Sequence, residues 1–259
     1  MSESEPWVPR TDRGDHRGYA LLGALLAAVL GIGAAFALSA IFVLLLGGFG
    51  GEFSMPVLVG VLFVTSAVGL IGAGSGYLLL RGISISGYVR TRIPSFRDLL
   101  WVGGGYVAAL GLVFVAGVIL TVFQVQPQTT NQAAELGMEN PSILLWLVPL
   151  SIFVIAPGEE FLFRGVVQGR LREAFDPIIA IPITAAIFAA IHYTSLTGAA
   201  EARLVAIAIL FFPSLVFGLA YEQTENLVVP ILIHGIYNST LVLLVYVTIQ
   251  MVGQTPTPV

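Results

Sequence analysis

The chain has no cysteine among its 259 residues, and only 10% of its residues are charged. The absence of cysteine excludes disulfide bonds, thiolate metal sites and a cysteine nucleophile. A soluble domain carries about a quarter charged residues, whereas here 57% of the residues are hydrophobic and the mean hydropathy is +0.94. The formal net charge of -4 gives no basis for binding nucleic acid. The composition therefore indicates an integral membrane protein whose surroundings are the lipid bilayer.

Long apolar runs are the main feature that the sequence does contain. A helix crosses the hydrocarbon core with about 20 apolar residues. We therefore predict an all-α fold, a polytopic membrane bundle of about seven (six to eight) transmembrane helices, in which the fifth and sixth are short enough to be re-entrant or strongly offset. The seven candidate runs are 19–46, 56–80, 99–125, 142–164, 177–193, 204–221 and 229–251.

The arginines are distributed unevenly among the loops, and none of the basic residues is a lysine. Short cytoplasmic loops collect positive charge. Only Arg203 departs from a topology with the amino terminus in the cytoplasm and the carboxyl terminus outside the cell membrane, and the loop 126–141 has no basic residue. The other arginines precede the first run, separate the second from the third, or follow the fourth: Arg10, Arg13, Arg17, Arg81, Arg90, Arg92, Arg97, Arg164, Arg170 and Arg172.

Five ionisable residues interrupt the apolar runs of the second half: Glu159, Glu160, Arg164, His192 and His234. Ionisable side chains inside a membrane are costly, so each one indicates a functional site by default. Residues four apart share a face of a helix, and we therefore expect Glu160 to form an ion pair with Arg164. Glu159 points elsewhere and has no partner in its own helix.

The same spacing of four residues recurs in two later runs. Phe188 and His192 share one helix face, as do His234 and Asn238. A structural role is the plain alternative, because a single histidine in an apolar helix commonly just hydrogen-bonds a neighbour.

The positions of Glu159 and His192 favour a shared site over that alternative. Glu159 lies 17 residues before Asp176, which marks the turn between the fourth and fifth runs, and His192 lies 16 residues after it. In an antiparallel helical hairpin these two side chains fall at nearly the same level.

Glutamate and histidine without cysteine indicate general acid–base chemistry or a metal site. A carboxylate in an apolar site can act as a general base on water, with a histidine beside it. A second histidine with an asparagine amide can donate hydrogen bonds to a developing oxyanion. These parts together describe the attack of water on a carbonyl. A transport protein, or a non-catalytic membrane protein with a buried polar cluster, is the alternative, although the repeats typical of transporters are not evident.

Three short stretches between residues 149 and 246, EEFLFR, FAAIH and HGIYN, occur in this order. They resemble the three motifs of the CAAX protease and bacteriocin-processing (CPBP) family, whose best-known members are the type 2 CAAX prenyl endopeptidases. The resemblance implies an intramembrane endopeptidase that acts on a membrane-associated peptide or protein substrate near the membrane surface.

The resemblance also implies roles for seven residues. Glu159 and His192 would activate water, and His234 and Asn238 would form the oxyanion site or coordinate a metal. The supporting residues would be Glu160, Arg164 and Phe188. The expected division of the chain is a disordered cytoplasmic tail at 1–18, N-terminal transmembrane helices at 19–141, the catalytic membrane domain at 142–251 and a flexible tail at 252–259.

The cofactor stays open between none and zinc. Two histidines and one glutamate, here His192, His234 and Glu159, could hold zinc and leave a position for water. The metal-free reaction uses the same side chains, and the chain has no HExxH helix that would decide between them.

Overall fold

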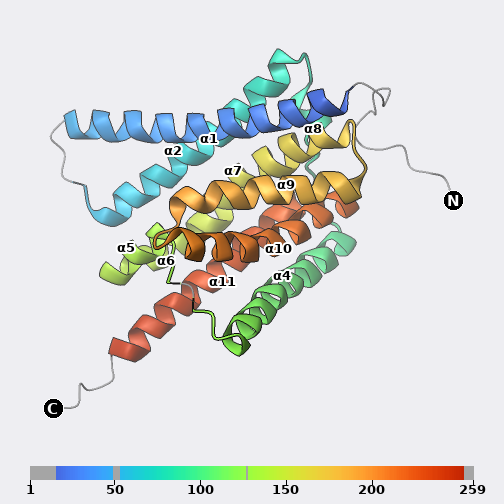
Figure 1. The fold of residues 1–259 in the computed structure, drawn as a ribbon. Coiled ribbons are helices and arrows are strands. Elements are labelled where there is room, and N and C mark those ends of the chain that lie inside the picture. Colours follow the sequence, from blue (N-terminus) through green and yellow to red (C-terminus); the bar gives the residue numbers. More distant parts are fainter. Residues whose placement is uncertain (1–15, 49–52, 127, 254–259) are drawn as a thin grey trace, which may run out of the picture.

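The computed structural model describes residues 16–48, 53–126 and 128–253, which form helices, their connections and one isolated β-bridge. Seven helices within these residues are long and apolar enough to cross a membrane (Figure 1). This finding confirms the predicted all-α polytopic bundle. Five of the seven are single helices: α1 (Arg17–Gly48), α2 (Met55–Leu80), α4 (Phe96–Val122), α10 (Ala200–Thr224) and α11 (Val228–Gly253).

The fifth span consists of α9 (Pro177–Ile191) and a 3-10 turn, η3 (His192–Ser195). Two short helices lie in the connections, α3 (Ile85–Tyr88) and α5 (Gln132–Glu139). Helix α1 begins at Arg17, within the predicted tail 1–18, and α11 ends at Gly253, within the predicted tail 252–259. The rest of those tails, 1–15 and 254–259, lies outside the described residues.

The fourth span is a composite helix that extends to Arg172, eight residues beyond the predicted end at Arg164. It continues because its polar residues beyond Arg164 have buried partners in the bundle. Pro149 and Pro157, which lack a backbone N–H and disturb α-helical hydrogen bonding, flank its first π-helical segment. The segments in order are α6 (Ser142–Leu150), η1 (Ser151–Ile155, π-helical), α7 (Ala156–Glu160), η2 (Phe161–Gln168, π-helical) and α8 (Gly169–Arg172).

The composite helix lies between two groups of helices (Figure 1). The α1–α2 hairpin packs against it on one side, while α4 packs on α10 and α11 on the other. Glycine allows one especially close approach, because a Cβ on Gly235 of α11 would lie 2.8 Å from the Cα of Ile152 in η1. Helices α9, α10 and α11 complete the bundle around the composite helix, so residues of all four spans can meet in its interior.

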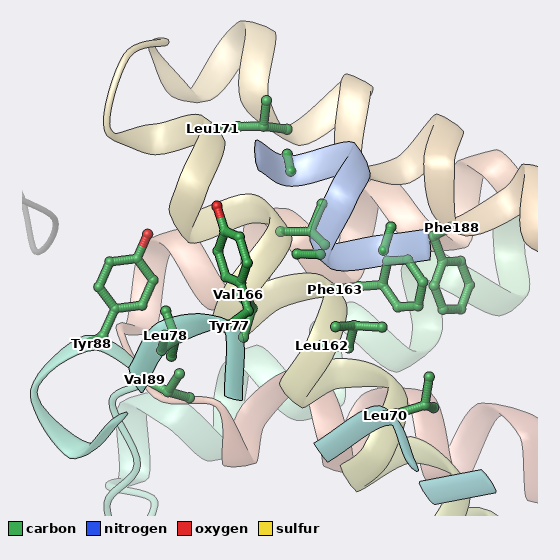
Figure 2. Close-up of a cluster of buried hydrophobic side chains, with 14 of the residues drawn as sticks. Leu70, Tyr77, Leu78, Tyr88, Val89, Leu162, Phe163, Val166, Leu171 and Phe188 are labelled. Carbon is green, nitrogen blue, oxygen red and sulfur yellow. The ribbon is translucent and has the colours of Figure 1, made fainter. Parts of the chain in front are cut away.

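The main hydrophobic cluster fills the space between the α1–α2 hairpin, the composite helix and α9 (Figure 2). Leu162, Phe163, Val166 and Leu171 contribute fully buried side chains from the composite helix. Phe188 of α9 belongs to the same cluster and packs edge-on against Phe163, with ring centroids 5.1 Å apart. Residues of the EEFLFR and FAAIH stretches therefore pack in one hydrophobic core.

The connections gather at two opposite ends of the bundle, as an alternating seven-span topology requires. At one end Leu227 N donates to Arg90 O at 2.9 Å, which joins the α2–α4 connection to the α10–α11 turn. At the other end Thr197 N donates to Thr130 O at 2.9 Å, which joins the α5 region to the turn after α9. There Arg203, the exception in the arginine distribution, donates to Gly198 O.

Glu173, in the turn after α8, collects several partners at the first end. Arg81 donates two hydrogen bonds to its carboxylate, at 2.8 and 2.9 Å, and Tyr88 donates one at 2.6 Å. Arg170 forms a further ion pair with it. Burial raises the pKa of Glu173, but the bonds from Arg81 and Tyr88 outweigh burial and lower it below the ordinary value. The ionised carboxylate therefore ties α2 and the α3 region to the end of the composite helix.

Candidate active site

The expected ion pair of the first motif lies in the interior of the bundle. Arg164 Nε is 3.1 Å from Glu160 Oε2, and both side chains are fully buried. Arg164 Nη2 also donates to Ser214 Oγ at 2.9 Å and to Ser214 O at 3.1 Å. Glu160 ends α7 and Arg164 lies in η2, so the pair crosses the junction at which the helix changes its winding.

Glu160 has a second partner, His234, which the sequence did not indicate. His234 Nδ1 lies 2.8 Å from Glu160 Oε1. A carboxylate only accepts hydrogen bonds, so Nδ1 carries the proton. In the neutral ring Nε2 is then an acceptor, and it receives a hydrogen bond from the Asn238 amide at 3.0 Å. Glu160 therefore selects the tautomer of His234 and, through it, the orientation of the Asn238 amide.

Glu159 is the carboxylate without such partners. Its Oε2 atom is buried and makes no hydrogen bond within the described residues, although 19% of the side chain remains exposed. An ionisable group that approaches this oxygen is His234, whose Nε2 lies 3.8 Å away. A buried oxygen that accepts no hydrogen bond calls for an explanation, and a water or substrate group at this position would supply one.

The imidazole of His192 bonds to its own span and, among the described residues, to neither glutamate. The predicted fifth run, 177–193, places this residue near the end of an apolar helix, and in the structure it follows α9 as the first residue of η3. Its Nδ1 lies 2.8 Å from Phe188 O. Since a carbonyl can only accept, this contact leaves Nε2 as the acceptor of the neutral ring. No hydrogen bond or ion pair joins His192 to Glu159 within the described part of the chain.

Aromatic rings connect His192 to the rest of the site. The Phe188 ring lies 4.7 Å from that of His192 and 5.7 Å from that of His234, between ring centroids. Arg164 Cζ lies 4.7 Å from the centroid of the same Phe188 ring, in cation–π contact. Phe188 thus contacts three of the candidate residues, His192, His234 and Arg164.

Two residues of α10 complete the surroundings, and neither was predicted. Ser214 holds Arg164, and Phe217 stacks on His234 with ring centroids 4.8 Å apart and an angle of 19° between the planes. A serine and a phenylalanine in an apolar helix carry no signal that would separate them from ordinary packing residues. Only the three-dimensional arrangement of the helices identifies them.

The proposed zinc ligands are not brought together. Among the described residues no group of three or more His, Asp or Glu side chains is arranged to hold a metal ion. Glu159 and His234 approach each other, but no hydrogen bond or ion pair joins either of them to His192 in the described part of the chain. The trio of Glu159, His192 and His234 therefore does not fit a zinc site, and we derive no step of a reaction through a metal.

Comparison with known protein families matches residues 141–240 to the family described as Type II CAAX prenyl endopeptidase Rce1-like. The matched segment runs from the start of α6 into α11 and contains all of the residues discussed above. Comparisons with curated proteins and with solved structures gave no match. Through this segment, which is less than half of the chain, the protein is similar to the CAAX protease and bacteriocin-processing family of membrane proteases.

Proposed function

We propose that this protein is an intramembrane endopeptidase in which Glu159 and His192 activate a water molecule for attack on a peptide bond. The observation that carries the proposal is the state of Glu159, a carboxylate with a buried, unbonded oxygen beside a histidine–asparagine pair. A carboxylate in such an environment is a suitable general base. The family match supports peptide hydrolysis as the reaction.

The first step is the attack of water on the carbonyl carbon. Glu159 accepts a proton from the water while the water oxygen forms a bond to the carbon. His192 assists by accepting a hydrogen bond from the same water at Nε2, the nitrogen that its contact with Phe188 leaves available. The electron pair of the carbonyl bond moves onto its oxygen, which becomes the oxyanion of a tetrahedral intermediate.

Asn238 and His234 stabilise this oxyanion. The amide of Asn238 has two N–H groups, of which one donates to His234 Nε2, and the second is available to the oxyanion. His234 supports the oxyanion through Asn238, because its Nε2 accepts the first N–H and so directs the second. Donors held in place before the reaction begins stabilise developing charge without reorganisation, and the bond from His234 Nδ1 to Glu160 provides that fixed orientation.

The second step breaks the carbon–nitrogen bond. The oxyanion re-forms the carbonyl, and the leaving nitrogen takes the proton that Glu159 accepted from water. One water is consumed, and a carboxyl group and an amine are released. Glu159 returns to its ionised form, so the cycle needs no other reactant.

The substrate class follows from where the site lies. It is enclosed by membrane-spanning helices, so a membrane-associated peptide or protein is the expected substrate and the bilayer the second partner. The arginine distribution supports a multi-pass protein of the cell membrane with its amino terminus in the cytoplasm.

A comparison of membrane-protein termini tests the proposal. Cells producing the wild-type chain, Glu159→Gln or the matched control Glu139→Gln would be compared for newly formed amino termini, at equal amounts of each protein in the membrane. Glu139 is an exposed residue of α5, outside the site. We expect a set of termini that the wild type and Glu139→Gln share and that Glu159→Gln lacks. Identical termini in all three would contradict the proposal.

A further inference from the structure

Helix α10 and the second half of the composite helix run in the same direction and are joined by three polar contacts. Each contact links residues fifty positions apart, and successive contacts are four residues apart along both helices. The residues that form these contacts are buried, except that Glu222, in the last contact, is partly exposed. The contacts are Arg164 to Ser214, Gln168 Nε2 to Gly218 O at 3.1 Å, and Arg172 Nε to both carboxylate oxygens of Glu222 at 3.0 Å.

The first of these contacts reaches the candidate active site. Ser214 holds Arg164 by Nη2, while Nε of the same guanidinium faces Glu160. Because the guanidinium is planar and rigid, fixing one nitrogen fixes the direction of the others. Glu160 in turn holds His234 by Nδ1. A continuous chain of polar contacts therefore leads from α10 to the His234 ring.

Phe217 reaches the same ring directly. It lies three residues after Ser214 and thus on the same side of α10. Its ring is stacked on His234, and Arg164 Cζ lies 5.5 Å from the Phe217 ring centroid. Phe217 is fully buried. Helix α10 therefore contacts both ends of the chain that joins Arg164 to His234.

We infer that Ser214 and Phe217 are positioning residues for the proposed hydrolysis: Ser214 fixes Arg164, and with it Glu160, while Phe217 fixes the plane of the His234 ring. Neither residue touches the reacting atoms in this account. The consequence for catalysis rests on the proposed function. The predicted effect on His234 does not rest on it, because that effect concerns only which ring nitrogen carries the proton and how the ring is oriented.

The variants are chosen to change one contact at a time. Ser214→Ala removes the hydroxyl but leaves the backbone oxygen that also binds Arg164, so the fold should persist. Ser214→Thr restores a hydroxyl. Thr224→Ala is the matched control, because Thr224 is another buried hydroxyl of α10, bonded to Ala220 O and not to the site. Phe217→Leu removes the aromatic ring while filling much of its volume.

The direct measurement is nuclear magnetic resonance of ¹⁵N-labelled histidine in the detergent-solubilised protein. The signals of His234 are assigned by their loss in His234→Gln. In the wild type we expect the tautomer that carries its proton on Nδ1. Ser214→Ala should shift the His234 nitrogens toward a mixture of tautomers, and Phe217→Leu should abolish the ring-current shift of the His234 ring protons. Ser214→Thr and Thr224→Ala should resemble the wild type.

The kinetic measurement uses a substrate identified by its newly formed terminus. A displacement on the scale of 1 Å can cost about 100-fold in rate, so we expect kcat of Ser214→Ala to fall by about 10- to 100-fold with KM little changed. Unchanged His234 signals and rates in both Ser214→Ala and Phe217→Leu would overturn the inference and leave the protease assignment standing. Altered His234 signals in a protein that cleaves nothing would uphold the positioning and reject the proposed function.

Discussion

The two adjacent glutamates of the first motif should respond in opposite ways to the same substitution. Glutamine has the shape of glutamate but cannot accept a proton from water at neutral pH. Glu160 Oε1 accepts a hydrogen bond from His234 Nδ1 at 2.8 Å, and Glu160 Oε2 forms an ion pair with Arg164, 3.1 Å from Nε. Glu159 has no hydrogen bond at Oε2 and only the longer contact to His234 Nε2. Glutamine at position 160 therefore disrupts a buried network, whereas glutamine at position 159 disrupts few contacts.

The size of each effect can be estimated from these contacts. In Glu160→Gln, one of the two carboxylate oxygens becomes an NH₂ group, so a donor must face either Arg164 or His234. Leaving a buried charge without its partner costs about 3–5 kcal/mol, which corresponds to a fall in melting temperature on the order of 10 °C. In Glu159→Gln the cost should be under about 1 kcal/mol, while the loss of the general base lowers the rate by about 10²–10⁴-fold.

The assay compares the two variants in three measurements: the yield of detergent-solubilised protein, its melting temperature and its rate of cleavage. Glu139→Gln serves again as the control for the substitution itself. We expect Glu159→Gln to be stable and nearly inactive, and Glu160→Gln to be both unstable and inactive. The reasoning is refuted if Glu159→Gln is the unstable variant and Glu160→Gln is folded as well as the wild type.

Three further predictions concern the bundle as a whole. Cysteines introduced by Ser95→Cys and Thr130→Cys should be labelled from opposite sides of the membrane, with residue 95 cytoplasmic, and labelling of both from one side would contradict the topology. Gly235→Ala should lower both melting temperature and activity, because the new Cβ would meet the backbone of η1 at 2.8 Å, whereas Gly60→Ala adds a methyl group in open space and should change neither. Since the pKa of Glu173 is lowered in the fold, its ionised form stabilises the protein above the ordinary carboxyl pKa of 4.5, and this stability should be lost as the pH falls below that value. Glu173→Gln should melt lower at neutral pH and depend less on acid, and an unchanged melting temperature would show that this carboxylate contributes nothing.

The sequence predicted the bundle well because length and hydropathy alone define membrane spans. The same information placed the end of the fourth span too early. In the sequence, polar residues such as Gln168 and Arg172 indicate the start of a loop, but in the structure each bonds to a residue of α10. Polar residues end a membrane helix only when the fold offers them no partner, and this cannot be read from one helix at a time.

The site was predictable to the extent that it follows helical spacing. The pairs Glu160–Arg164 and His234–Asn238 are both four residues apart within one span, and both form contacts. The contact of Glu160 with His234 joins different spans and was missed. The level of His192 relative to Glu159 stays a prediction: it assumed two regular helices, whereas the composite helix contains π-helical segments and His192 itself lies in a 3-10 turn.

The winding of η2 explains how its two polar side chains, Arg164 and Gln168, both face α10. In an α-helix, with about 3.6 residues per turn, a step of four residues overshoots one turn, so a row of every fourth residue drifts around the helix in one sense. In a π-helix each hydrogen bond spans five residues, the turn is wider, and the same step falls short, so the row drifts in the other sense. Where two parallel helices face each other, opposite rotations about their axes move the facing side chains toward the same side. The two rows therefore stay in contact. A one-residue deletion that returned 161–168 to α-helical winding would separate Arg164 from Ser214 even though every residue of both rows remained in the chain.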